Sequence, residues 1–331
     1  MDLESQRKIT AILRLLAEAG RPLGSLAIAR GLQSLGIDLK ERMVRYYLDQ
    51  MDRDGLTENL GRPGRTITDR GRKELETAVA VDKVGFISAK VDELSYRMCF
   101  DLHRRTGTVI LNVSSIDARQ FPRAQRLVNL VLDAGLGMGR FIGVARAGEV
   151  LGRHRVPEGK VAIGTICSVT LNGILRVAGI PTGSRFGGLL ELREGQPLRF
   201  TQIINYDGTT LDPVEIFIKG KMTSVGKAAR TGTGTIGASF REIPAAALAD
   251  AEAVIRRLGA AGLGGVLAVG RPGRALLDVP VQQGRVGLIV AAGLNAIAVL
   301  EEEKIDTENH AMATLCEFER LIFSANFTDA T

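Results

Sequence analysis

The body of this chain repeats itself, and the duplication limits the folds that it can adopt. Four short anchors recur in one order at offsets of 122 to 127 residues. They are Phe121-Pro122 with Ile243-Pro244, Ala134–Gly137 with Ala261–Gly264, Val156-Pro157 with Val279-Pro280, and Leu171-Asn172 with Leu294-Asn295. One such pair in Gly-rich sequence can arise by chance, whereas four in order indicate two copies of one structural unit.

Each copy can be read coarsely as strand, helix, strand, strand, helix, strand, with one more strand before the second helix of the first copy. In the first copy we expect strands at 108–113, 140–145, 149–153, 161–166 and 187–192, and helices at 124–134 and 168–178. The strands at 140–145 and 149–153 should pair around residues 146–148. In the second copy we expect strands from 233 and at 266–269, 275–279 and 313–319, and helices at 245–258 and 293–302. This order is that of the ferredoxin-like plait.

The segment 39–65 has the pattern of a helix followed by a basic loop. Apolar residues three and four apart define one helical face, and Gly55 stands where a C-cap is expected; they are Leu39, Met43, Val44, Leu48 and Met51. Strands at 56–60 and 66–68 can pair around a tip that holds two arginines and no acid. The outward side chains of the helix and the tip are then Lys40, Arg42, Arg45, Tyr46, Arg62 and Arg65.

Two helices before this segment complete a known arrangement. A helix is expected at 7–19, and a second from about 25 to 35, with Ser25 as its N-cap. Helix, turn, helix, turn, recognition helix and wing is the winged variant of the helix-turn-helix, which places a helix in the major groove of double-stranded DNA.

These patterns predict an α/β (α+β) chain with an N-terminal winged helix-turn-helix followed by a duplicated ferredoxin-like βαββαβ regulatory domain. The winged helix is expected at 1–82 and the regulatory domain at 83–325, with repeats at about 84–198 and 199–322. A helix at 72–80 should join the two domains. Extra strands are expected near 84–102.

Charge gives less support for DNA binding than the basic isoelectric point suggests. Residues 1–82 contain 14 Lys plus Arg and 13 Asp plus Glu, so that the net charge of this domain is +1. The prediction therefore rests on the placement of the bases ahead of Asp49, Asp52 and Asp54. An ordinary solvated helix face is the alternative for these bases, and the complete order of elements favours DNA.

Cysteines and histidines do not suggest a metal site. Cys99, Cys167 and Cys316 are far apart, and the three histidines do not cluster with them. We expect reduced thiols, no metal and no cofactor. The absence of a long apolar run and of a basic, then apolar, N-terminus favours a cytoplasmic protein without membrane contact.

The chain resembles NrpR-type nitrogen regulatory repressors in both parts. In the N-terminal domain the resemblance lies in VRYYLDQMDRDGLTENLGRPGRTITDRG. In the duplicated domain it lies in GLGMGRFIGVARAGE, VAIGTICSVTLNGILRVAGIPTGSRFGGLLEL and FTQIINYDGTTLDPVEIFIKGKMTSV. The resemblance implies a homodimeric repressor of nitrogen-assimilation operons that releases its operator, an inverted repeat, when 2-oxoglutarate accumulates. Some members carry two regulatory domains, and this chain has room for one.

An acidic effector needs positive charge and free N–H groups. The helix that begins near Ser168 offers backbone donors, with Thr170 and Asn172 in its first turns, and the loop 181–185 ends in Arg185. We expect one carboxylate of a small dicarboxylate at the Ser168 helix end and the other on Arg185. Arg146 and Lys221 are further candidates. The alternative for each is structural: caps for Ser168 and Thr170, backbone partners for Asn172 and a surface turn for Arg146.

No motif for catalysis stands out. The Gly-x-Gly of residues 135–139 follows a helix, where glycine acts as a C-cap, instead of preceding one as a phosphate-binding loop does. His-Glu-x-x-His and Gly-x-Ser-x-Gly are absent. Two other functions stay open: an enzyme that converts a small acid and carries a DNA-binding domain, and an interaction module recruited by partner proteins.

Overall fold

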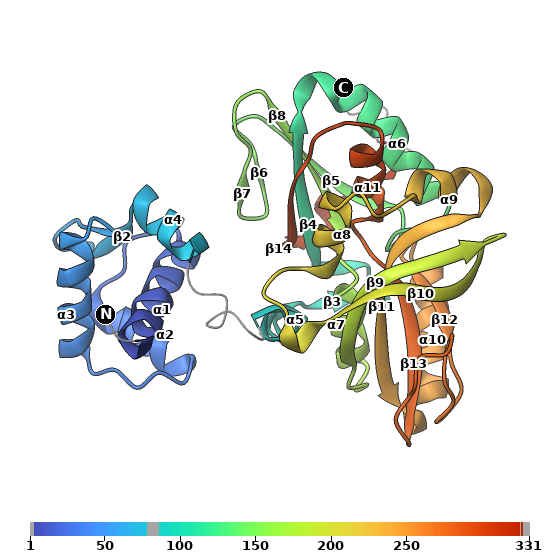
Figure 1. The fold of residues 1–331 in the computed structure, drawn as a ribbon, viewed down its shortest axis with the longest axis horizontal. Coiled ribbons are helices and arrows are strands. Elements are labelled where there is room, and N and C mark those ends of the chain that lie inside the picture. The colour runs from blue at the N-terminus through green and yellow to red at the C-terminus, as the bar shows by residue number, and fades with distance from the viewer. Residues whose placement is uncertain (1–2, 78–85, 325, 327–331) are drawn as a thin grey trace. The chain divides into compact units, whose positions relative to one another are not determined.

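A computed structural model of the chain describes residues 3–77, 86–324 and 326. It divides into two compact units, Met1–Lys83 and Val84–Thr331 (Figure 1). The domain junction expected at residues 82 and 83 lies outside the described residues, as do the last three residues of the helix expected at 72–80.

The first unit is a winged helix, as predicted. Its elements are α1 (Leu3–Ala19), α2 (Ser25–Ser34), α3 (Glu41–Arg53), β1 (Thr57–Asn59), β2 (Arg65–Ile67) and α4 (Asp69–Thr77). Strands β1 and β2 form an antiparallel hairpin. Ile12, Leu32 and Leu48, one from each of the first three helices, are fully buried in a single core.

Two predictions about the helices of this unit are wrong. Ser25 is the first helical residue and not the N-cap of α2; Gly24 is the cap residue. The Ser25 hydroxyl instead donates to Glu41 at the start of α3 (2.9 Å). Met43 is 42% exposed and Tyr47 is buried in its place, because Tyr47 lies one turn from Val44 and Met51 on the inner face.

The second unit contains two large antiparallel sheets. The first sheet has the order β14-β4-β8-β5-β15, and β3 pairs with β4. The second has the order β10-β9-β11-β13-β12. The strands are β3 (Phe100–Asp101), β4 (Thr106–Asp117), β5 (Phe141–Arg146), β8 (Lys160–Ile166), β9 (Gly183–Arg193), β10 (Gln196–Asn205), β11 (Gly234–Pro244), β12 (Val266–Val269), β13 (Arg285–Ala291), β14 (Glu308–Glu317) and β15 (Ile322–Phe323).

The two repeats exchange their last strands. The strands of the first repeat are β4, β5, β8 and β9, and those of the second are β11, β12, β13 and β14. Strand β9 pairs with β11 of the second repeat, and β14 pairs with β4 of the first. Each sheet therefore has the fourth-first-third-second order of a ferredoxin-like plait, with its fourth strand supplied by the other repeat.

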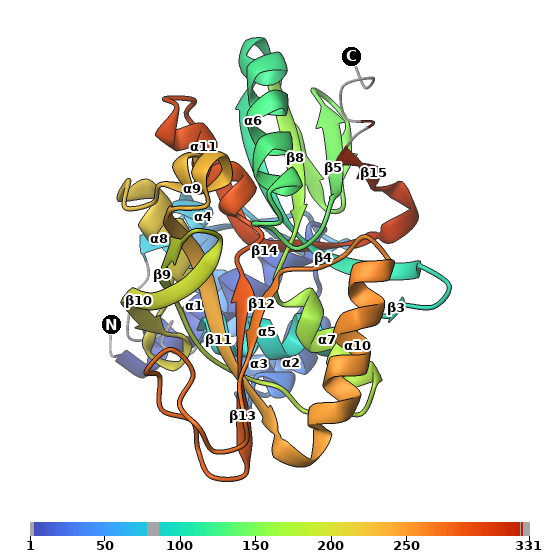
Figure 2. The same cartoon turned by 90° about the vertical axis from the view of Figure 1, so that its right-hand side faces the viewer.

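The helices follow the same exchange. Helix α6 (Phe121–Asp133) of the first repeat packs with α11 (Asn295–Glu302) of the second. Helices α7 (Thr170–Val177) and α10 (Leu248–Ala260) contribute to the other core, which they share with β13. Figure 2 shows α6 against β8 and β5, and α10 beside β12 and β13. Neither repeat can close its core without the other.

The duplication is confirmed, but the residues that are equivalent in the structure are not all those that the sequence anchors paired. Helices α7 and α11 begin 125 residues apart, and so do β8 and β13. Thr170 and Asn295 are therefore equivalent, in contrast to the expected pairing of Asn172 with Asn295. Their hydrogen bonds support this equivalence. The Thr170 side chain bonds the N–H and the carbonyl of Ile110, and the Asn295 side chain bonds the N–H and the carbonyl of Gly237.

Three predicted strands are wrong. Residues 86–97 form helix α5 (Phe86–Arg97) where strands were expected. Residues 149–153 do not pair with β5; β6 (Val150–Leu151) instead forms a hairpin with β7 (His154–Arg155). Residues 275–279 form a tight turn closed by a Leu276–Val279 bridge, and the third strand of the second repeat is β13.

Candidate DNA-binding surface and effector cavity

Helix α3 presents a basic and aromatic outer face. Lys40, Arg42 and Arg45 are exposed, and Tyr46 is 57% exposed while its neighbour Tyr47 anchors the helix. The Arg45 guanidinium pairs with Glu41 on the preceding turn. Arg42 makes no ion pair within the described part of the chain, which leaves its five donors available to an outside acceptor.

The wing places only one of its two predicted arginines at the tip. Arg62 is exposed between Gly61 and Gly64, both of which have positive φ (75° and 106°). Arg65 lies on β2, where its Nε donates to Asp52 (2.9 Å) and its Nη2 pairs with Asp49. Only 15% of the Arg65 side chain is exposed. The structure thus gives Arg65 a role in fixing the wing to α3, instead of the tip position expected for it.

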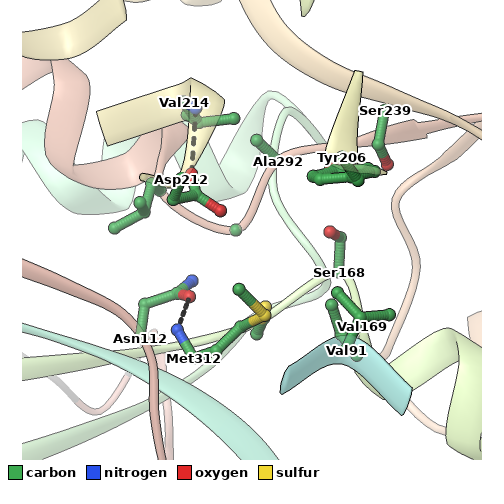
Figure 3. Close-up of a pocket in the computed structure, with 13 residues that line it drawn as sticks. Val91, Asn112, Ser168, Val169, Tyr206, Asp212, Val214, Ser239, Ala292 and Met312 are labelled. Carbon is green, nitrogen blue, oxygen red and sulfur yellow. Dashed lines mark hydrogen bonds between the residues drawn. The ribbon is translucent and has the colours of Figure 1, made fainter. Parts of the chain in front are cut away.

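A small cavity of about 20 Å³ lies where the two repeats meet. Cys167–Val169, just before α7, and Ala292–Leu294, just before α11, line it from equivalent positions 125 residues apart. Asn112 of β4 and Ser239 of β11 are an equivalent pair as well. Figure 3 shows Ser168, Ser239, Tyr206 and Asp212 around the same space. The segments that lead into two helices therefore border one cavity, whereas the first-turn N–H groups of Thr170 and Asn295 are already bonded to the carbonyls of Cys167 and Ala292.

A buried arginine contacts Ser168 in the wall of this cavity without lining the cavity itself. Arg241 of β11 is 1% exposed, and its Nη1 donates to the Ser168 carbonyl (2.7 Å) and to Asn172 Oδ1 (2.6 Å). Its Nε has no hydrogen-bond partner. Burial lowers the pKa of Arg241, and no carboxylate of the described residues forms an ion pair with it. Arg241 was not predicted from the sequence, because a single Arg in a strand is usually exposed.

The structure does not bring the predicted effector residues together. Ser168 lines the cavity, whereas Thr170 is buried and bonded to Ile110, and Asn172 joins Arg241 to Ser184. Arg185 lies in a separate open pocket, where its Nη1 donates to Glu242 (2.8 Å). Arg146 is exposed at the end of β5, and Lys221 is exposed after α8 (Pro213–Lys219), with a positive φ of 52°.

Helix α5 forms one wall of the cavity and is held by specific bonds. Val91 lines the cavity, and Lys90 Nζ donates to the Ala311 carbonyl (3.0 Å). Arg176 of α7 donates to two carbonyls at the other end of α5, those of Ser95 and Met98. In the sequence, α5 is the first described element after the junction with the winged helix.

Two acids beside α5 lie in an environment that disfavours their charge. Burial raises the pKa of Asp212, whose Oδ1 accepts from the N–H groups of Val214 and Glu215. Burial, with a contribution from Asp212, raises the pKa of Glu215 from 4.5 to about 7. Glu215 also accepts from the N–H of Ala311. A protonated carboxyl at Asp212 can donate a hydrogen bond to an anion in the cavity.

Glu215→Gln is expected to change how stability depends on pH. Because the folded-state pKa is raised, the contribution of Glu215 is full below pH 4.5 and is lost as the pH rises to about 7. This loss amounts to roughly 3 kcal/mol of unfolding free energy. Urea denaturation at about pH 5 and about pH 8 should show that the variant gains stability relative to the wild type only at the higher pH. An equal difference at both pH values would contradict the assignment.

Within the described residues, no group of three or more His, Cys, Asp or Glu side chains could hold a metal ion. Cys167 and Cys316 are buried free thiols, Cys99 is an exposed one, and burial raises the pKa of Cys167 to about 11. No helix of the described chain combines the length and apolar character needed to span a bilayer.

Comparison with known proteins matches both units. The NrpR regulatory domains NRD1 and 2 match residues 84–322, and the ribonuclease R winged-helix domain matches residues 10–75. The chain is 33% identical over 321 residues to the global nitrogen regulator NrpRI of Methanosarcina mazei, covering 97% of this chain and 99% of that one. It is 28% identical to the global nitrogen regulator NrpR of Methanococcus maripaludis, covering 88% of this chain and 50% of that one.

A solved structure is also similar. It is that of a nitrogen repressor-like protein from Methanococcus jannaschii, with a TM-score of 0.62 and 28% sequence identity. The match covers 71% of this chain and 97% of that chain.

Proposed function

This chain belongs to the NrpR family of nitrogen regulators, and from that membership we propose that it represses nitrogen-assimilation genes and releases its operator when 2-oxoglutarate binds. The coarser conclusion, a nitrogen regulator with a winged helix for DNA, follows from the family. The effector and its site are the proposal. The observation that carries the site is Arg241, a buried cation that forms no ion pair with any described carboxylate. It contacts Ser168 in the wall of a cavity that the segments before α7 and α11 border.

Operator recognition is assigned to α3 and the wing. Arg42 and Tyr46 lie on the outer face of α3, where a recognition helix meets base edges in the major groove. Lys40 and Arg45, near the start of α3, are placed to contact DNA phosphates, and Arg62 at the wing tip is placed to contact the DNA backbone. Because one winged helix reads few base pairs, we propose a homodimer on an inverted repeat.

The effector is placed between the two repeats. A dicarboxylate needs cationic or N–H donors for both ends. Ser168 and Gly293, in the segments that lead into α7 and α11, can offer backbone N–H groups from two sides, whereas those of Cys167 and Ala292 are bonded to Ile110 and Gly237. Arg241 supplies the charge that was expected from Arg185. Burying a guanidinium without a counter-charge is costly, and a bound carboxylate would offset that cost.

Binding must widen the cavity. Its 20 Å³ suffice for about one water molecule, so a five-carbon dicarboxylate has to displace part of the wall. Helix α5, which is held there by Val91 and the Lys90 contact, precedes β3 and follows the junction with the winged helix. Displacement of α5 would therefore reach the DNA-binding unit along the chain.

The experiment is a measurement of operator affinity with and without 2-oxoglutarate. We expect the dissociation constant to rise by about 5- to 150-fold, and the operator to weaken 2-oxoglutarate binding by the same factor. Glutarate, which lacks the keto group, serves as the control ligand. Equal operator affinities would reject the effector, and consumption of 2-oxoglutarate during the assay would support the enzyme alternative.

A further inference from the structure

A second, larger pocket lies in the regulatory unit at one end of the sheet that contains β9, β11 and β13. Its volume is about 530 Å³, within the range of pockets that hold small metabolites. Ser184 and Arg185 line it from the start of β9, Glu242 from the end of β11, and Arg285 from the start of β13. Asp207, which follows β10, also lines the pocket.

The charges in this pocket are balanced, but only half of them are paired. Arg185 and Glu242 form an ion pair (2.8 Å), and Glu242 is almost fully buried. Arg285 and Asp207 form no ion pair within the described parts of the chain, and they do not reach each other across the pocket. One free cation and one free anion thus face the same space.

We propose that this pocket binds a small zwitterion of the α-amino acid class. Its carboxylate would sit on the Arg285 guanidinium, which accepts both oxygens in a planar fork. Its ammonium group would sit on Asp207. Gln282 and Ser184, which also line the pocket, offer amide and hydroxyl groups to the side chain.

The charge balance argues against ligands of a single sign. A simple anion would meet Arg285 but also the Asp207 and Glu242 carboxylates, and a simple cation would meet Arg185 and Arg285. Repulsion between like charges in one pocket opposes binding, whereas a zwitterion can pair with both Arg285 and Asp207.

This site is separate from the effector cavity and does not depend on the proposed 2-oxoglutarate response. Asn172 lies between the two, since its Nδ2 donates to Ser184 Oγ (3.0 Å) and its Oδ1 accepts from Arg241. The two pockets share no lining residue, so operator and 2-oxoglutarate binding can be measured apart from amino-acid binding, and either proposal can fail alone.

The test is isothermal titration of the full chain with each of the twenty α-amino acids. We expect at least one to bind, and Arg285→Ala and Asp207→Asn each to weaken that binding at least tenfold. Arg271→Ala removes an exposed arginine outside the pocket and should leave it unchanged. Circular dichroism checks that the variants fold.

Analogues of the bound amino acid complete the test. Its decarboxylated amine and its deaminated acid should each bind at least tenfold more weakly, because each satisfies only one of the two free charges. The proposal is overturned if no amino acid binds, if Arg285→Ala and Asp207→Asn bind as the wild type does, or if either analogue binds equally well.

Discussion

Arg42→Ala is expected to weaken operator binding by about 1–3 kcal/mol per half-site, which is about 5- to 150-fold, and to relax sequence preference at the contacted base pair. Arg42 is exposed on α3 and is not engaged by any acid of the described chain. Its loss therefore removes a contact without breaking a bond inside the protein. Electrophoretic mobility shift titrations on operator and on mutated operators measure both effects.

Arg45→Ala should cost less than Arg42→Ala, since Arg45 already pairs with Glu41 and must give up that partner to reach DNA. Arg53→Ala is the matched control: it removes the same charge from the last turn of the same helix and should change operator affinity little. If Arg42→Ala and Arg53→Ala were equivalent, α3 would not be the recognition element.

Arg62→Ala should have a different signature. A phosphate contact contributes equally to all sequences, so the variant is expected to weaken specific and non-specific binding together and to reduce the slope of log K against log salt by about 1 per half-site. Arg65→Ala, by contrast, should act through the wing, because Arg65 is tied to Asp49 and Asp52.

Sequence predicted the winged helix and the duplication, but it did not predict the exchange of strands. The apolar pattern of β9 and β14 marks them as strands with buried faces, and the same pattern fits pairing with either repeat. The choice depends on where α7 and α11 direct the chain. That direction is set by the junctions at 167–169 and 292–294, where Gly293 lies against the Ile166 carbonyl and leaves no room for a Cβ.

The missed strand β13 and the missed helix α5 have separate causes. Strand β13 is a continuous apolar run buried on both faces, which periodicity cannot assign to strand or helix. In α5 only Ile87, Val91 and Ser95 are buried, four apart, and the β-branched residues at its start favour a strand instead. Packing against α7 decides in favour of the helix.

The candidate effector site was predicted only in part, because it depends on contacts between the two repeats. Ser168 was found because a helix start can be predicted from sequence. Arg241 was not, since its burial exists only because α7 of the first repeat covers β11 of the second. A site assembled by exchange between repeats leaves no local signal in either repeat.

Arg241→Met is the variant with the largest expected effect on the effector response. Removing one partner of a buried, hydrogen-bonded charge pair costs about 2–5 kcal/mol of binding. We therefore expect 2-oxoglutarate affinity to fall at least about 30-fold, as measured by isothermal titration. The apo protein should keep its stability within about 1–2 kcal/mol, because methionine fills the volume and the uncompensated charge is gone.

The effects of Arg241→Met on 2-oxoglutarate affinity and on the stability of the apo protein together distinguish an effector-binding role of Arg241 from a structural role. If Arg241 served the fold, Arg241→Met would lower the urea midpoint of the apo protein, and 2-oxoglutarate would still bind to the folded fraction. If Arg241 binds the ligand, the urea midpoint of the apo variant equals that of the wild type. Saturating 2-oxoglutarate then stabilises the wild type by about 2.7 kcal/mol at 100 times the dissociation constant, but it does not stabilise the variant. Arg193→Met, at an exposed arginine on β9, is the control and should keep both properties. Loss of apo stability with unchanged affinity would reject the placement of the effector beside Arg241.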